Sequence, residues 1–199
     1  MIDTPAPTTL IVVAYHSGHG HTARLAESVR DGAGLVEGVR AELLPVADIT
    51  DGQWDLLDAA DAIVFGSPVH MGAAAPEFAT FGRDSVARWT TLRWKDKIAA
   101  GFVNSGSKNG DKLHVLQGMA LLAAQHGMHW ISLGMPGGWN SSTGSEDDLN
   151  RLGVWLGAAA QSNVDEGAEA MSKSDLLTAE HLGTRVAEQT RIYRAGPAV

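Results

Sequence analysis

The sequence predicts an α/β protein built as a doubly wound, five-stranded parallel sheet with helices on both faces. Apolar, β-branched segments alternate with segments whose apolar residues recur at helical spacing, in the order β-α-β-α-β-α-β-α-β-α. Strands that are continuously apolar are typical of parallel sheets buried on both sides. Right-handed crossovers and the number of strands favour the spatial order 2-1-3-4-5.

Five segments are expected to form the strands. The first is TTLIVVAY at 8–15, an apolar run that ends at a Gly-rich loop. ADAIVFGSPV at 61–70 and KIAAGFVNSG at 97–106 are also apolar, and each runs into a turn. The other two expected strands are 39–47 and 129–134.

The expected helices lie between and after these strands. Pro76 suits the first position of a helix, where its missing N–H has no intrahelical partner to lose. Ser172 and Asp175 have the spacing of a capping box at the start of the last helix. Helices are therefore predicted over 22–36, 53–60, 76–89, from Leu113 to near Gly127, and over 175–193.

Residues 135–174 differ from the rest of the chain. Gly, Ser, Asn and Asp interrupt this stretch, and only 149–160 has the pattern of an ordered element. A connection of this length in a compact domain is usually functional or part of an interface. We interpret 1–199 as one domain in which 135–174 is an extended insertion or covering segment before the last helix.

The composition excludes several classes of protein. The formal net charge of −8 argues against a nucleic-acid partner, because phosphate binding needs a positive field. The absence of cysteine excludes disulfides, zinc–thiolate sites and iron–sulfur clusters. No apolar run reaches the roughly 18–20 residues of a membrane span, and the start lacks the pattern of a signal peptide. We therefore expect a cytoplasmic protein without a membrane span.

Three loops rich in small and polar residues follow the first, third and fourth expected strands. They are HSGHGHT at 16–22, SPVHMG at 67–72 and NSGSKNG at 104–110. In the predicted strand order these three strands are adjacent, so their loops gather where the strand order reverses. Ligands of doubly wound sheets bind in the crevice at that point.

The first loop opens a helix, whose free N–H groups and dipole favour an anion. Gly18 and Gly20 allow close approach of the backbone to a phosphate, and Ser17 and Thr22 add hydroxyl donors. The loop has no Lys or Arg and matches neither the P-loop nor the dinucleotide pattern, which favours a monophosphate. The alternative is a plain tight turn that caps a helix.

The same loop contains three histidines, His16, His19 and His21, which raises the question of a metal site. Their spacing matches no standard zinc pattern, and the loop has no Cys, Asp or Glu. We expect no metal.

The other two loops have the residues for a planar, polar ring. Pro68 gives rigidity, Gly72 gives access, and the side chains between them can lie against a ring. Loop 104–110 supplies hydroxyl, amide and N–H donors for ring carbonyls and nitrogens. The alternatives are an ordinary strand-to-helix turn and a solvated loop.

With these loops the chain resembles the WrbA-type NAD(P)H:quinone oxidoreductases of the flavodoxin-like superfamily. The resemblance covers nearly the whole chain and is clearest in SGHGHTARLA at 17–26, ADAIVFGSPVHMG at 60–72, NSGSKNG at 104–110, QHGM at 125–128 and LTAEHLGTRVAE at 177–188. It implies a flavodoxin-like fold that binds flavin mononucleotide (FMN) without a covalent bond.

The resemblance also implies roles for individual residues. The first loop matches the one that holds the FMN phosphate, the second lies beside the isoalloxazine, and the third contacts the ring and ribityl chain. His126 matches a histidine near the polar edge of the ring. The predicted cofactor-binding residues are Ser17, Gly18, His19, Gly20, His21, Thr22, Pro68, Val69, His70, Met71, Gly72, Asn104, Ser105, Gly106, Ser107, Lys108, Asn109 and His126.

Substrate contacts are implied for His19, in the nicotinamide-contacting part of the first loop, and for Trp89, which matches an aromatic residue of the quinone pocket. His19 and His70 are the candidates for a proton donor. His19 stands where the family has Tyr, His70 where it has Arg, and 135–174 lacks the family's typical sequence. From the residues alone, His126 could instead interact with a helix end, and Trp89 could belong to the core or an interface.

The predicted function is an FMN-dependent oxidoreductase that passes two electrons from NAD(P)H to a quinone-like acceptor. The resemblance implies a homodimer or homotetramer. Two alternatives stay open at this point: a flavodoxin-like electron carrier without a substrate pocket, and an NAD(P)H-dependent flavin or nitroaromatic reductase.

Overall fold

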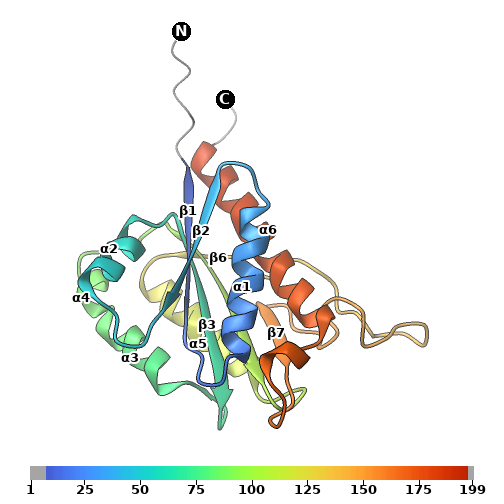
Figure 1. The fold of residues 1–199 in the computed structure, drawn as a ribbon. Helices are drawn as coiled ribbons and strands as arrows, with labels where there is room; N and C mark the ends of the chain where they lie inside the picture. Colours follow the sequence, from blue (N-terminus) through green and yellow to red (C-terminus); the bar gives the residue numbers. More distant parts are fainter. Residues whose placement is uncertain (1–7, 197–199) are drawn as a thin grey trace.

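The predicted sheet is present in a computed structural model, which describes residues 8–196; the first seven residues, on which part of the signal-peptide argument rests, lie outside that range (Figure 1). The strands run in the order β2-β1-β3-β5-β6, and all of these neighbours are parallel. Their bounds are Thr9–Tyr15 for β1, Val39–Pro45 for β2, Ala62–His70 for β3, Ile98–Ser105 for β5 and His129–Trp130 for β6. The predicted order 2-1-3-4-5 is confirmed when β4, a two-residue hairpin partner of β3 at Ala73–Ala74, is set aside.

Helices cover both faces of the sheet. Alternate residues of a strand point to opposite faces, so Val12 of β1 packs on one side and Val13 on the other. The helices α1 (His21–Gly34) and α6 (Lys173–Ala195) cover the Val13 side. The Val12 side is covered by α2 (Asp51–Ala59), α3 (Pro76–Asp84) and α5 (Lys112–Gln125).

Helices α1 and α6 pack closely along their length (Figure 1). A Cβ atom on Gly32 of α1 would overlap the backbone at Glu180, and one on Gly183 of α6 would overlap the backbone at Val29. Glycine at both positions lets the two backbones touch. This contact fixes the direction of α1, whose amino end faces the carboxyl ends of the strands.

The fifth strand departs from the prediction of one segment at 129–134. Only His129 and Trp130 pair with the start of β5. The chain then leaves the sheet and returns as β7, Ala158–Gln161, which pairs in parallel with the second half of β5. One strand position is therefore shared by two short segments, and residues 131–157 lie between them.

Two local predictions are corrected. The helix expected over 76–89 is broken at Ser85, after which α4 spans Val86–Trp89; the buried Ser85 hydroxyl donates to the carbonyl of Gly82 at 2.7 Å. Ser172 precedes α6 as predicted, but its side chain makes no capping bond. Asp175 instead forms a buried ion pair with Arg151, which contradicts the capping box.

A short 3₁₀ helix, η1 (Ala168–Ala170), precedes α6. No helix within residues 8–196 combines the length and apolar character required to cross a membrane.

Candidate functional site

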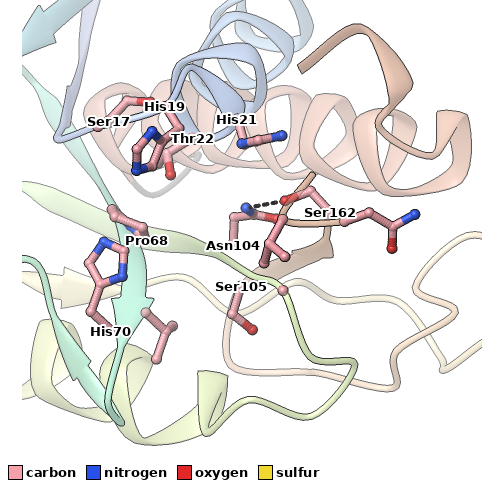
Figure 2. A pocket seen from close by; sticks show the side chains of 14 residues that line it. Ser17, His19, His21, Thr22, Pro68, His70, Asn104, Ser105 and Ser162 are labelled. Atoms are coloured by element: carbon pink, nitrogen blue, oxygen red, sulfur yellow. Dashed lines mark hydrogen bonds between the residues drawn. The ribbon is translucent and has the colours of Figure 1, made fainter. Parts of the chain in front are cut away.

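A cavity of about 340 Å³ lies at the carboxyl ends of β1, β3 and β5, where the strand order reverses (Figure 2). Its volume is in the range of small-molecule and cofactor sites. All three predicted loops contribute to its walls, and so does a fourth segment. The lining residues are Ser17, Gly18, His19, His21, Thr22, Pro68, Val69, His70, Asn104, Ser105, Gly106, Ser162, Asn163 and Val164.

The first wall is the loop that leads into α1. Gly20 precedes the helix with a φ of 90°, a conformation that glycine adopts without strain. Its N–H donates to Ser17 Oγ at 3.1 Å, which closes the turn. The N–H of Arg24 donates to the Gly20 carbonyl, which is the first turn of the helical hydrogen-bond pattern. The earlier N–H groups of α1 face the cavity side with the positive end of the helix dipole, an arrangement that suits an anion.

The three histidines of this loop point to different partners. His16 Nε2 lies 3.3 Å from the carboxylate of Glu77, and His21 Nε2 lies 3.0 Å from the carbonyl oxygen of Glu166. His19 projects over the cavity (Figure 2). Within residues 8–196, no three His, Asp or Glu side chains are grouped to hold a metal ion.

The second wall follows β3. Pro68, Val69 and His70 line the cavity, and Figure 2 shows the His70 ring across from His19. Met71 and Gly72 form the turn to β4 with φ values of 50° and 80°. The Met71 side chain is fully exposed and does not line the cavity.

The third wall carries an unpaired acceptor. The Asn104 side chain is 95% buried, and its Nδ2 donates to Ser162 Oγ at 2.8 Å (Figure 2). Within the part of the chain that the structure describes, its Oδ1 has no hydrogen-bond partner. Buried polar atoms are nearly always paired, so an orphan acceptor on a cavity wall fits a ligand that brings a hydroxyl or N–H donor.

The fourth wall, Ser162 to Val164, was not predicted. It follows β7 just as the other three loops follow their strands. Sequence reasoning missed it because 129–134 was assigned as the complete fifth strand. The polar residues after AAAQ at 158–161 were the available signal, since a polar loop after a short apolar run marks the other three walls as well.

Several predicted site residues lie outside the cavity. Gly20 shapes the turn without lining the wall, and Ser107 offers its carbonyl to Lys112 behind the loop. Lys108 and Asn109 line a second cavity of about 380 Å³ on the far side of the loop, together with Trp139. The Lys108 ammonium lies 4.8 Å from the centre of the Trp139 ring.

His126 and Trp89 are brought together, but not at this cavity. They share a shallow groove at the carboxyl ends of α4 and α5, at the opposite end of the sheet. His126 stacks on Trp94 with ring centres 4.5 Å apart, and its Nε2 lies 2.9 Å from Ser85 Oγ. Burial without a charged partner lowers the pKa of His126. Trp89 is about half exposed.

Comparisons with known proteins agree with this geometry. Residues 12–114 match the family model described as flavodoxin domain. A relative named flavodoxin FldP, from Pseudomonas aeruginosa, is 41% identical over 88% of this chain and 94% of its own length. The crystal structure of a WrbA-like flavodoxin from Agrobacterium tumefaciens is 39% identical, covers 94% of this chain and 99% of its own, and has a TM-score of 0.75.

The chain belongs to the WrbA-type flavodoxin family. The family resemblance predicted from the sequence is thereby confirmed. A relative from Archaeoglobus fulgidus named NAD(P)H dehydrogenase (quinone) is 29% identical over 89% of this chain and 95% of its own length.

FMN is the cofactor of this flavodoxin, as predicted. The residues at the cavity fit it. The amino end of α1 suits a monophosphate, and the orphan Oδ1 of Asn104 suits a hydroxyl of the ribityl chain. A Cβ on Gly106 would lie 2.7 Å from Val164 Cγ1, so only glycine brings the third and fourth walls this close.

Proposed function

We propose that this flavodoxin is an FMN-dependent oxidoreductase that transfers two electrons from NADH or NADPH to a quinone-like acceptor. The overall reaction is balanced as NAD(P)H plus quinone plus one proton giving NAD(P)⁺ plus quinol. FMN supplies the redox chemistry, since it accepts hydride equivalents and returns them to a second substrate.

One observation carries the proposal. The cavity has a fourth wall, Ser162 to Val164, so it is a pocket built from four segments and not an open sheet edge. A pocket with walls suits small substrates that must lie against the ring, whereas a carrier must present the flavin edge to a protein. The relative named NAD(P)H dehydrogenase (quinone), which covers 89% of the chain, adds support.

Residues on different walls of the cavity have different roles in this proposal. The backbone N–H groups at the start of α1 hold the phosphate, and Asn104 orients the ribityl chain. His19 and His70 stand on two different walls with polar ring nitrogens at the mouth of the cavity. Either imidazole can deliver the proton that the quinol oxygen requires, or orient a water that does so.

Steady-state assays of the FMN-loaded protein test the proposal. NADH and NADPH oxidation is measured with a series of benzoquinones. We expect turnover that falls in the double variant His19→Gln/His70→Gln. His114→Gln is the matched control, because His114 lies on the exposed side of α5 away from the cavity. No nicotinamide oxidation with any quinone would refute the proposal.

The second candidate is an electron carrier, which the relative named flavodoxin FldP favours. The acidic surface of the chain would then dock a basic redox partner. A redox titration separates the two: a carrier is reduced in two separate one-electron steps, and a two-electron reductase in one. A thermal-shift screen with quinones, nitroaromatics and free flavin identifies the acceptor, because a true ligand stabilises the folded state.

Trp89 and His126 enter this proposal through a second copy of the chain. Their shared groove lies outside the flavin cavity, so the half-exposed Trp89 reaches a flavin only across an interface between protomers, and His126, which is 1% exposed, lies beneath the surface of the groove. The proposal thus includes a homodimer or homotetramer. A cytoplasmic location is a separate part of the proposal. Size-exclusion chromatography of wild-type protein and Trp89→Ser tests it: a monomeric wild type with full quinone reductase activity would remove both residues from the site.

A further inference from the structure

Lys112 is a buried cation in an unfavourable place. It is the first residue of α5, where the positive end of the helix dipole repels a positive charge, and it is only 1% exposed. Burying an ammonium group is costly unless its hydrogen bonds are replaced. Proteins depart from the preference for anions at helix amino ends and for exposed charges mostly at functional sites, so the contacts of Lys112 can indicate a function.

Those contacts all go to one loop. The Lys112 ammonium donates to Ser105 Oγ and to the Ser107 carbonyl, both at 2.5 Å, and to the Lys108 carbonyl at 3.1 Å. The Asn109 carbonyl is at 3.4 Å. These residues form the third wall of the flavin cavity and the turn behind it. Lys112 therefore holds this loop from the side that faces away from the cavity.

A single residue, Ser105, separates the Lys112 ammonium from the cavity. Ser105 lines the cavity wall, and its hydroxyl is the group that the ammonium contacts. None of the ion pairs formed within residues 8–196 includes Lys112. The charged groups nearby are Arg151 and Asp175, which pair with each other and so largely cancel.

We propose that Lys112 is a positioning residue for FMN: it holds the 105–109 loop in its flavin-binding conformation and places a positive charge that favours electron uptake at the cavity. Reduction adds negative charge to a bound flavin, and a cation fixed in a buried setting stabilises it more than it would in water. The inference rests on the proposed placement of FMN in this cavity. It does not depend on which acceptor is reduced.

The protonation state of Lys112 provides a second way to test its effect on the flavin. Burial is the main cause that lowers its pKa from the ordinary 10.5 to about 8; Asp175 raises the pKa and Arg151 lowers it. The ammonium is charged below this value and neutral above it. Lys108 on the same loop is turned toward Trp139 and does not compensate for the loss. The effect of Lys112 on the flavin is therefore expected to fade as the pH rises above 8.

The test compares Lys112→Met and Lys112→Arg with Lys97→Met. Lys97 is a matched control: its ammonium also bonds backbone carbonyls, of Asp58 and Ala60, and burial also lowers its pKa, but it lies at the start of β5, far from the cavity. FMN affinity is measured by quenching of flavin fluorescence, the midpoint potential by redox titration from pH 6.5 to 10, and stability by urea unfolding.

We expect Lys112→Met to weaken FMN binding at least about tenfold and to move the midpoint potential to more negative values, while Lys112→Arg keeps most of the potential. Lys97→Met is expected to change stability but neither flavin property. Unchanged affinity and potential in Lys112→Met would overturn the proposal.

The midpoint potential of FMN bound to the wild-type protein tests the role of the charge without any variant. Above pH 8 this potential should fall more steeply with pH than the potential of free FMN. The same slope for bound and free FMN up to pH 10 would refute the role of the charge. Wild-type protein that binds FMN but reduces no quinone would count against the proposed function alone. Wild-type protein whose FMN affinity is unaffected by changes on all four walls would count against the placement of FMN.

Discussion

The substitution Asp175→Asn tests how the fourth wall of the flavin cavity is held. Asp175 accepts two hydrogen bonds from Arg151, Nε to Oδ1 and Nη2 to Oδ2, both at 2.8 Å. Its Oδ2 also accepts the N–H of Gln161 at 2.9 Å, which ties the end of β7 to α6. Both charged side chains are at most 4% exposed. An asparagine keeps the shape but leaves the guanidinium buried without a counter-charge.

The expected loss follows from that geometry. Removing one partner of a buried, bidentate pair costs about 3–5 kcal/mol, because the remaining charge is uncompensated. For a chain of this size, each kcal/mol lowers the melting temperature by about 2–4 °C, so a decrease of about 6–20 °C is expected. The double variant Arg151→Met/Asp175→Leu removes both charges and is expected to recover at least half of the loss.

Urea unfolding at neutral pH measures the free energies, and FMN titration measures the site. Asp31→Asn is the control, since its ion pair with Arg30 is exposed and is expected to contribute less than about 1 kcal/mol. Asp175→Asn is also expected to weaken FMN binding, because β7 leads into Ser162–Val164. A loss below about 1 kcal/mol, or a double variant no more stable than the single one, would show that the ion pair does not hold this wall.

Three further predictions concern single residues. Gly20→Val forces a β-branched residue into a left-handed turn with a φ of 90° and is expected to weaken FMN binding at least about tenfold; wild-type affinity would place the phosphate elsewhere. Asn104→Ala removes the orphan acceptor and is expected to weaken FMN binding about three- to tenfold, with Thr190→Ala in α6 as a buried control that leaves affinity unchanged. In His126→Phe the free energy of unfolding should decrease less at low pH than it does in the wild type. Because the pKa of His126 is lowered in the folded state, the unfolded state binds more protons below about pH 6.5, and stability falls as the pH falls through that range. Unfolding free energies at pH 5, 6 and 7 that drop equally in wild type and variant would contradict this.

The parts of the fold set by local pattern were predictable from the sequence. The apolar runs of β1, β3 and β5 identify buried strands without reference to the rest of the chain. The loops after them are rich in glycine and short polar residues, and strand order then places these loops together. Three of the four cavity walls follow from this reasoning alone.

The split fifth strand was not predictable in the same way. Ala158, Ala159 and Ala160 have no β-branched side chain, and alanine favours helices over strands. They form a strand because the second half of β5 has a free edge and little space beside it: a Cβ on Gly157 would overlap the carbonyl of Gly101. Pairing with a distant segment decides the structure here, and a window of sequence does not contain that information.

The capping box at Ser172 and Asp175 failed for a related reason. The spacing is correct for a local cap, but Asp175 lies where the buried Arg151 needs a counter-charge. A buried guanidinium without a partner costs more free energy than one lost cap, which is worth about 1 kcal/mol. The long-range ion pair therefore takes the carboxylate, and the helix begins without a side-chain cap.

The same contrast between local and long-range contacts applies to the support of the cavity walls. The three predicted loops line the cavity, are proposed to bind the phosphate, the ribityl chain and the ring, and follow directly from strands of the sheet. The back of the third loop and the end of β7, which leads into the fourth wall, rest instead on two buried cations. The partners of Lys112 lie three to seven residues before it, and the partner of Arg151 is Asp175 of α6. If Lys112 has the role proposed above, substitutions at these two cations are expected to alter the flavin potential and the shape of the pocket while every residue that lines the cavity stays the same.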